Sequence, residues 1–248
     1  MTIYVFYASQ IAAQVGKNPF VPVEDTMCKV WKRRDNPSYS KALERNKKKE
    51  HVIKFTPQVQ RKVDKVTETA TPEDISEKIQ EILREEKSVS ARDVSQVVYT
   101  TRGKRDEEAS TIEYTRQSGK IVNNRNDRLY KKYFPYEGKK EFMICGKTDG
   151  ITEDNVLIEV KNRQKKILSP IPYHELIQVH VYMILTGLRE CTFVQTCGET
   201  TISENVEFDK AIWEETLEKL KDFSRDLDKV LETPELQDEI ISSSTDLL

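Results

Sequence analysis

The spacing of apolar residues changes at Gly119, and this change most constrains how the chain folds. Before it, a segment opening near Ser90 carries Val94, Val97 and Val98 at helical spacing, which predicts a helix running toward Gly119. After it, short apolar runs between turn residues predict β-strands near 121–122, 142–144, 156–160 and 192–196. The pattern predicts an α/β core wrapped by helices.

Helical spacing returns toward the end of the chain, where we expect a helix over 176–188 and a long closing helix over 213–230. Thr71, Pro72, Glu73 and Asp74 form a helix start, with an N-cap, a proline and early acids. We expect a single domain over 1–248 with a basic helical insertion at 36–90. The last residues, 234–248, are predicted to form a loose tail.

Composition limits the class of protein. A hydrophobic fraction of 37% beside a charged fraction of 33% indicates a soluble chain, and no apolar run reaches the roughly 20 residues that span a bilayer. The apolar N-terminus lacks the pattern of a signal peptide. The four cysteines form neither a CxxC pair nor a Cys/His cluster, which argues against structural zinc and disulfides. We therefore expect an intracellular protein that is neither secreted nor bound to a membrane.

Positive charge is concentrated in one segment. Between Lys29 and Lys65 there are thirteen Lys or Arg residues and four Asp or Glu residues, although the whole chain has a net charge of -2. Such a segment suits contact with a polyanion, because each cation that neutralises a phosphate releases a counterion. The alternative is a solvated helical face, and the sequence leaves both open.

Three polar residues in the strand-rich half carry the best candidate chemistry. Asp149 follows an apolar run at a glycine turn, and Glu159 and Lys161 lie two apart on the next predicted strand. Side chains two apart in a strand project from the same face, which leaves Ile158 and Val160 to face a core. A hairpin over this segment would bring Asp149 beside Glu159.

Two carboxylates held close together repel each other, and burial would raise their pKa values further. A divalent cation relieves both costs, and an oxygen ligand set without Cys or His favours Mg²⁺, with Mn²⁺ as a substitute. The Lys161 ammonium could orient or deprotonate an attacking water, or screen charge on a phosphate. For an isolated Glu-x-Lys pattern, an exposed pair on an amphipathic strand is the commoner explanation.

The order Asp-x9-Glu-x-Lys resembles the PD-(D/E)xK nuclease motif, with the spacing of the lambda exonuclease and YqaJ-type recombinase family. Many relatives have proline before the Asp, where this chain has Thr148. The resemblance implies a restriction-endonuclease-like core with a mixed central sheet flanked by helices, and we expect a helical N-terminal part beside it. It also implies that Asp149, Glu159, the Val160 carbonyl and an upstream acid hold the metal ions.

Two further segments resemble family elements on either side of this motif. Gly103 to Glu107 resembles the Gly-x-x-x-Glu element, which makes Glu107 a further metal ligand, with Glu108 as the alternative register. Gln178 resembles the family's Gln motif, which binds the active-site Lys, the water or DNA. Tyr182 shares its helical face, four residues on, and is assigned with Arg102 to DNA binding.

The N-terminal segment resembles the family's opening Ser motif, in which Ser9 would hold the 5′-phosphate of the digested strand. A hydroxyl at a helix N-terminus suits a phosphate, although Ser9 could equally be an N-cap. The family's companion Arg has no counterpart here, and a basic residue of 29–65 could replace it.

Together these elements imply a 5′→3′ exonuclease that acts on double-stranded DNA with a free end. The resemblance further implies a single-strand annealing partner, a viral or phage origin with a place in the host cytoplasm or nucleus, and a homotrimer. The alternatives are a PD-(D/E)xK endonuclease, a structure-specific repair nuclease, and a non-catalytic DNA-binding protein of the same fold.

Overall fold

The computed structural model describes residues 3–71, 74–87, 89–123 and 125–248. The helices are η1 (Ala8–Gln10, 3₁₀), α1 (Ile11–Gln14), α2 (Val23–Arg34), α3 (Asn36–Arg45), α4 (Pro57–Thr69), α5 (Ile75–Glu85), α6 (Ala91–Ser118), α7 (Tyr173–Thr186), α8 (Lys210–Glu232) and α9 (Pro234–Ser243). The strands are β1 (Tyr4–Tyr7), β2 (Val122–Asn123), β3 (Tyr130–Glu137), β4 (Lys140–Gly146), β5 (Gly150–Thr152), β6 (Leu157–Asn162), β7 (Glu190–Cys197) and β8 (Thr200–Glu207). The predicted mixed α/β fold is confirmed.

The strands form two mixed sheets, in the orders β1-β4-β3 and β2-β5-β6-β7-β8. In the first, β4 runs parallel to β1 and antiparallel to β3. In the second, β5 and β6 form an antiparallel hairpin, while β6 and β7 are parallel. A parallel pair needs a crossover connection, and α7 provides it. The chain passes from the first sheet to the second between Gly146 and Gly150, so Asp149 lies where the two sheets meet.

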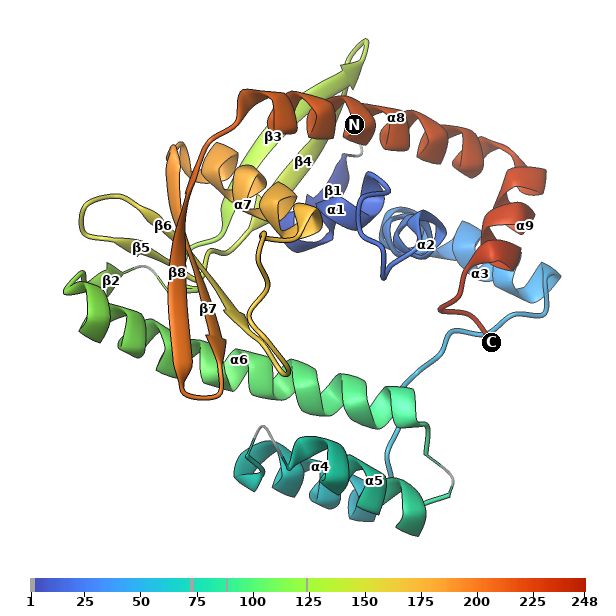
Figure 1. The fold of residues 1–248 in the computed structure, drawn as a ribbon. Helices are drawn as coiled ribbons and strands as arrows, with labels where there is room; N and C mark the ends of the chain where they lie inside the picture. Colours follow the sequence, from blue (N-terminus) through green and yellow to red (C-terminus); the bar gives the residue numbers. More distant parts are fainter. Residues whose placement is uncertain (1–2, 72–73, 88, 124) are drawn as a thin grey trace.

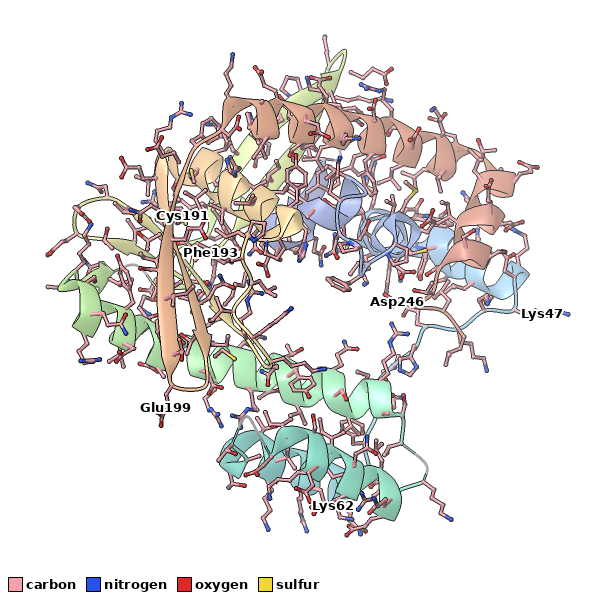
Figure 2. The ribbon with its side chains drawn as sticks, in the orientation of Figure 1. Lys47, Lys62, Cys191, Phe193, Glu199 and Asp246 are labelled. Carbon is pink, nitrogen blue, oxygen red and sulfur yellow. The ribbon has the colours of Figure 1, made fainter. Side chains whose placement is uncertain are left out.

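Three apolar clusters hold these elements together. The principal core joins the inner face of the first sheet to α7, α8 and the N-terminal helices, and Cys191 and Phe193 bring β7 into it (Figure 2). A second cluster joins Tyr114 of α6 to Ile158, Val160 and Val194. This confirms that Ile158 and Val160 face a core, so Glu159 and Lys161 take the opposite face.

Helix α6 matches its prediction closely. It starts after Ser90 and ends at Gly119, whose φ of 71° is the left-handed conformation that glycine adopts without steric cost. Figure 1 shows α6 passing beneath the five-stranded sheet, with α4 and α5 packed against its first half. The long helix therefore links the strand-rich half of the chain to a small helical subregion.

The helical insertion expected at 36–90 divides into two parts. Helix α3 packs Tyr39 and Ala42 into the principal core, so it belongs to the main body. Helices α4 and α5 form a separate core with the start of α6. Of the helix start predicted at 71–74, Pro72 and Glu73 lie outside the described residues, and α5 follows from Ile75.

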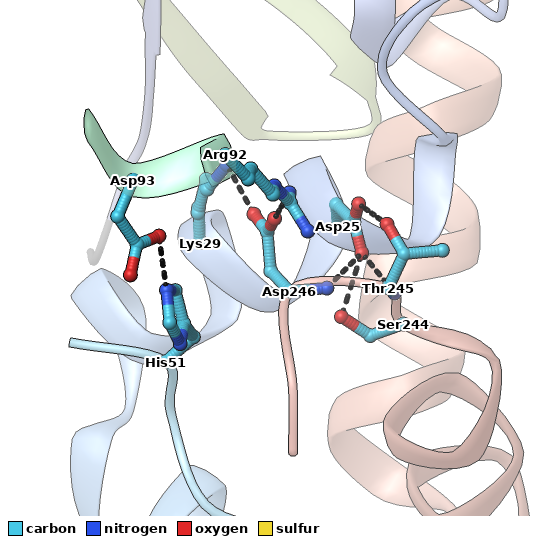
Figure 3. Close-up of polar contacts among 8 residues, drawn as sticks. All are labelled: Asp25, Lys29, His51, Arg92, Asp93, Ser244, Thr245 and Asp246. Atoms are coloured by element: carbon cyan, nitrogen blue, oxygen red, sulfur yellow. Dashed lines mark hydrogen bonds and ion pairs between the residues drawn. The ribbon is translucent and has the colours of Figure 1, made fainter. Parts of the chain in front are cut away.

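The prediction of a loose tail at 234–248 is wrong. Residues 234–243 form α9, which packs against α2, α3 and α8. The buried Asp25 carboxylate accepts hydrogen bonds from Ser244 Oγ, the Thr245 amide and the Thr245 hydroxyl at 2.6–2.7 Å (Figure 3). Asp246 pairs with Lys29 of α2 at 2.7 Å and Arg92 of α6 at 3.1 Å. The acidic, Ser-rich composition suggested disorder, but these side chains find partners far away in the sequence.

Within the described ranges, no helix is long and apolar enough to cross a membrane.

Candidate active site

The β5–β6 hairpin places Asp149 against β6. Its strand pairs end at Gly150 with Ile158, so the backbone of Val160 has no β5 partner. The amide of Val160 instead donates to Asp149 Oδ2 at 2.8 Å. Gly150 makes this approach possible, because a Cβ there would lie 2.2 Å from Val122 Cγ1. The predicted hairpin is thereby confirmed, and it places Asp149 in contact with Val160, the residue that follows Glu159.

Glu159 and Lys161 form a buried ion pair on the face of β6 that looks toward α7. Lys161 Nζ lies 2.5 Å from Glu159 Oε1 and donates to Gln178 Oε1 at 3.2 Å. The Glu159 side chain is only 1% exposed. The structure thus brings together Asp149, Glu159, Lys161 and Gln178, which the sequence separates by up to 29 positions.

Burial and mutual repulsion raise the pKa values of both carboxyl groups. Burial raises the pKa of Asp149 to about 6, against which the Val160 amide and the Lys161 charge act. Burial, followed by the charge of Asp149, raises the pKa of Glu159 to about 7. Carboxyl groups arranged in this way resist ionisation near neutral pH unless a cation compensates them.

The Lys161 amine is held in its charged form. Burial by itself lowers the pKa of an amine, but the charge and hydrogen bond of Glu159 outweigh burial and raise the pKa of Lys161. Of the two roles considered from the sequence, this environment favours a hydrogen-bond donor and charge screen over a base.

Glu107 lies on α6 near these groups. Burial, followed by the charge of Glu159, raises the pKa of Glu107, so the two carboxyl groups are close enough to interact. Glu108 has a side chain that is 72% exposed and lies 3.9 Å from Arg125. Of the two possible registers, Glu107 is therefore the one directed toward the hairpin.

The residues present suit a divalent cation. Glu159 Oε2 is buried and accepts no hydrogen bond from the described residues, although a buried carboxylate oxygen without a partner is costly. The carbonyl of Val160 points to the same side of β6 as its amide, toward Asp149. Among the described residues, no three Asp, Glu, His or Cys side chains gather closely enough to form a metal site by themselves. One or two carboxylates, a carbonyl and water suit Mg²⁺, which keeps several of its waters.

Tyr182 is buried on α7, one helical turn after Gln178. Its side chain is 6% exposed, and its hydroxyl interacts with the Gln178 amide. A Cβ on Gly146 would lie 2.8 Å from Tyr182 Cε1 and 2.9 Å from Ala8 Cβ. Tyr182 therefore supports Gln178 and packs over Gly146, a placement that does not favour its predicted role in DNA binding.

Ser9 is exposed and follows β1 directly, within η1. The residue before η1 is Tyr7, and no side-chain hydrogen bond caps this turn or α1. The N-cap interpretation of Ser9 is therefore not supported. Because Ala8 packs on Gly146, Ser9 lies on the segment that borders the β5–β6 hairpin, and its phosphate-binding role stays a prediction.

Arg102 occupies a structural position. Its side chain is 3% exposed, and its guanidinium donates to the carbonyls of Thr67 and Ala70 at the end of α4. Cations near a helix C-terminus stabilise its free carbonyls. This burial leaves little surface for a phosphate, so the predicted DNA contact is not favoured.

Two features near the hairpin were not singled out from the sequence. Arg125 lies beside Gly150, with its Cγ 3.6 Å from the position of a Cβ there. Burial raises the pKa values of Asp149 and Glu107, and the charge of Arg125 acts against that rise in both. Arg163 pairs with Glu175 through two hydrogen bonds of 2.7 and 2.6 Å, and so joins the end of β6 to the start of α7. The position of Arg163 two residues after Lys161, on the same strand face, is the signal that could have revealed it.

No family model matches the chain, and no curated protein matches it in sequence. Similar solved structures include an alkaline exonuclease from Laribacter hongkongensis, at 17% identity and a TM-score of 0.42 over 70% of this chain and 88% of that one. A phage-related exonuclease from Haemophilus somnus shows 10% identity and a TM-score of 0.44, over 94% of this chain and 96% of that one. Because all these TM-scores are under 0.5, they leave function to be inferred from the site itself. Fold and site define a mixed α/β protein with a buried Asp–Glu–Lys cluster at a sheet junction.

Proposed function

We propose that this protein is a metal-dependent nuclease that hydrolyses phosphodiester bonds at the β5–β6 hairpin. The observation that carries the proposal is the buried, unpartnered oxygen of Glu159 beside Asp149 and the Lys161 ammonium. Burying these groups lowers the stability of the protein without metal. Binding of Mg²⁺ and a phosphate would compensate their charges.

In this proposal Asp149, Glu159 and the Val160 carbonyl hold the metal, with Glu107 as a further ligand or orienting group. Bound Mg²⁺ would supply Lewis acidity toward the phosphoryl group and the attacking water. Lys161 keeps its proton and donates it in a hydrogen bond to the nucleophile or to a phosphate oxygen, where negative charge develops. Gln178 orients the ammonium by accepting one of its hydrogen bonds.

We further propose, from the resemblance of the motifs, that the substrate is double-stranded DNA digested 5′→3′ from a free end. The exposed Ser9 beside the hairpin supports a contact with the 5′-phosphate. A single-strand annealing protein is the partner that such a product implies, in viral or phage recombination. A homotrimer remains a proposal from resemblance.

The catalytic assignment is tested by incubating end-labelled linear duplex DNA with Mg²⁺ and each of Asp149→Asn, Glu159→Gln and Lys161→Ala. Each variant should fold, bind DNA and lose at least about 99% of the cleavage rate, the scale at which single electrostatic groups contribute. Glu153→Gln is the matched control, because Glu153 is exposed on the turn of the same hairpin. Retained cleavage in the three site variants would overturn the assignment.

Two comparisons then test the finer proposal. An exonuclease digests linear duplex and spares closed circular DNA, whereas an endonuclease cuts both. If Ser9 contacts the terminal phosphate, 5′-phosphorylated ends should be digested faster than 5′-hydroxyl ends, and Ser9→Ala should reduce that preference.

A further inference from the structure

The three-stranded sheet has one buried face and one open face. Tyr4, Phe6, Phe142 and Ile144 point into the principal core and are at most 4% exposed. Because side chains alternate along a strand, their neighbours point the other way. The opposite face belongs to the residues that lie between these core positions and to their partners on β3. This face is open at Tyr7 and along β3, whereas Cys145 of β4 is only 2% exposed.

Strand register arranges the open face in rows. Tyr7 of β1 lies beside Cys145 of β4, which lies beside Lys131 of β3. In the next row Tyr133 of β3 lies beside Met143. Tyr7 is 40% exposed and Tyr133 is 48% exposed. Two aromatic rings are thus presented diagonally on one sheet face, roughly 12 Å apart by strand geometry.

Cations accompany both rings. The guanidinium of Arg33 lies 5.0 Å from the centre of the Tyr7 ring, and its Nη2 donates to the Val5 carbonyl at 3.4 Å. Lys131 is exposed on β3, in the same row as Tyr7 and two residues before Tyr133. Neither Arg33 nor Lys131 forms an ion pair with any described carboxylate. The one acid on this face of β4, Glu141, is paired in register with Pro135 at the end of the strand away from Asp149.

The row that contains Tyr7 and Lys131 is also the row nearest the catalytic hairpin. Cys145 precedes Gly146, and Asp149 follows three residues later. On β1, Tyr7 leads directly into Ala8, which packs on Gly146, and into Ser9. A chain lying across this face can therefore continue toward the hairpin without crossing the core.

We propose that this open sheet face, made by Tyr7, Arg33, Lys131 and Tyr133, binds single-stranded nucleic acid. Bases stack on the two tyrosine rings, while Arg33 and Lys131 neutralise phosphates. An unpaired strand fits better than a duplex, because the faces of paired bases are covered by their neighbours and cannot reach the rings. The delivery of this strand to the hairpin rests on the proposed nuclease function, whereas the binding itself does not.

The test measures binding of a labelled oligo(dT) of about 16 nucleotides, the upper site size of a single-strand-binding fold. Fluorescence anisotropy of the full chain is recorded in EDTA, so that no Mg²⁺-dependent cleavage occurs. Tyr7→Ala and Tyr133→Ala should each raise Kd about fivefold or more, which corresponds to the loss of one stacked base. Tyr7→Phe and Tyr133→Phe keep the rings and should bind like the unaltered protein.

Charge is tested by Lys131→Glu, with Lys210→Glu as the matched control at the start of α8, where the Lys210 side chain is 79% exposed. Lys131→Glu should weaken binding and lower the slope of log K against log salt by about 0.7, as expected for one phosphate contact on a single strand. Lys210→Glu should leave that slope unchanged. Circular dichroism establishes that each variant is folded.

Unchanged oligo(dT) binding in folded Tyr7→Ala and Tyr133→Ala would overturn the inference. Equal losses for duplex and single strand would also overturn it, because they would indicate a general phosphate contact. The proposed nuclease function fails separately, if the unaltered protein does not cleave DNA with Mg²⁺. Binding in EDTA is read independently of that result.

Discussion

At the scale of single residues, the site depends on how burial alters charged groups. Asp149 and Glu159 lie where neither carboxylate ionises easily, and Lys161 compensates only one oxygen of Glu159. Polar groups in such surroundings are expensive unless a ligand completes them. The same residues exposed on a strand would be an ordinary charged pair.

Stability in the absence of metal should depend on pH at this site. The pKa values of Asp149 and Glu159 are raised above their usual values of 3.8 and 4.5 to about 6 and about 7. Their contribution to stability is therefore full below about pH 4 and is lost as pH rises to about 7. In EDTA, the free energy of unfolding should fall by up to about 6 kcal/mol from this source over that window, since each pKa unit corresponds to about 1.4 kcal/mol.

Denaturant titrations of the unaltered protein and Asp149→Asn at pH 4 and pH 7 measure this difference. Asp149→Asn keeps an oxygen that can accept the hydrogen bond from the Val160 amide, but its side chain does not ionise. Its free energy of unfolding should therefore fall less between pH 4 and pH 7. Because the ligands must lose protons to bind metal, Mg²⁺ should raise the melting temperature more at pH 8 than at pH 5. An equal fall in both proteins would contradict the assigned pKa shift of Asp149.

Gln178 provides a second prediction at this scale. Because Gln178 accepts a hydrogen bond from Lys161, Gln178→Ala should slow cleavage about 10- to 100-fold without abolishing metal binding. Measuring both kcat and the Mg²⁺ concentration needed for half activity shows whether Gln178 orients Lys161 or binds the metal. A large rise in the Mg²⁺ requirement with unchanged kcat would count against this role.

At the scale of elements, close approach between β4, η1 and α7 decides where the segment that leads to Asp149 lies. Gly146 ends β4 at the point where Ala8 and Tyr182 meet, and no room is left for a side chain. Displacing either neighbour would move η1 or α7, which carry Ser9 and Gln178. Gly146 therefore allows β4, η1 and α7 to pack closely together.

Gly146→Ala should destabilise the fold by about 1–3 kcal/mol, the usual cost of overpacking, and should slow cleavage by moving α7. Gly103→Ala is the matched control, because a Cβ there meets nothing within 4 Å and Gly103 lies inside helix α6. That substitution should leave stability unchanged or raise it by up to about 1 kcal/mol. Thermal melting and the cleavage rate of both variants provide the comparison, and equal effects would contradict the steric explanation.

At the scale of the whole molecule, the C-terminal segment ties distant parts together. Residues 244–246 satisfy Asp25 on α2, and Asp246 also reaches Arg92 at the start of α6 (Figure 3). Burial of Asp25 would raise its pKa, but these hydrogen bonds outweigh burial and lower it. The C-terminal segment is thus an ordered part of the fold that connects α2 with the start of α6.

Asp25→Ala should reduce the free energy of unfolding by about 2–4 kcal/mol, because it leaves several buried donors without an acceptor. The exposed Asp226, which pairs with Lys229 on α8, provides the control, and Asp226→Ala should change stability by less than about 0.5 kcal/mol. Because the pKa of Asp25 is lowered, its contribution should be present above about pH 4 and lost on further acidification. Urea unfolding of both variants at neutral pH measures the difference.

Local pattern explains which predictions succeeded. Helix α6 could be predicted because its caps, Ser90 and Gly119, enclose a helical stripe. The hairpin of Asp149 and Glu159 could be predicted because period-two spacing assigns each side chain to a face. Strands β3 and β8 were missed, since most of their side chains are exposed and show no apolar alternation.

The sequence by itself determined the α/β character, the face of β6 that carries Glu159 and Lys161, and the candidate residues of the site. Only the tertiary structure decided which candidates are buried beside one another, that Arg102 and Tyr182 support the fold, that 234–248 is ordered, and that Tyr7 and Tyr133 share an open face. The physical reason is the separation along the sequence of the residues that interact. Strand and helix periods arise between near neighbours, whereas burial, ion pairing and pKa shifts depend on groups brought together from distant parts of the chain.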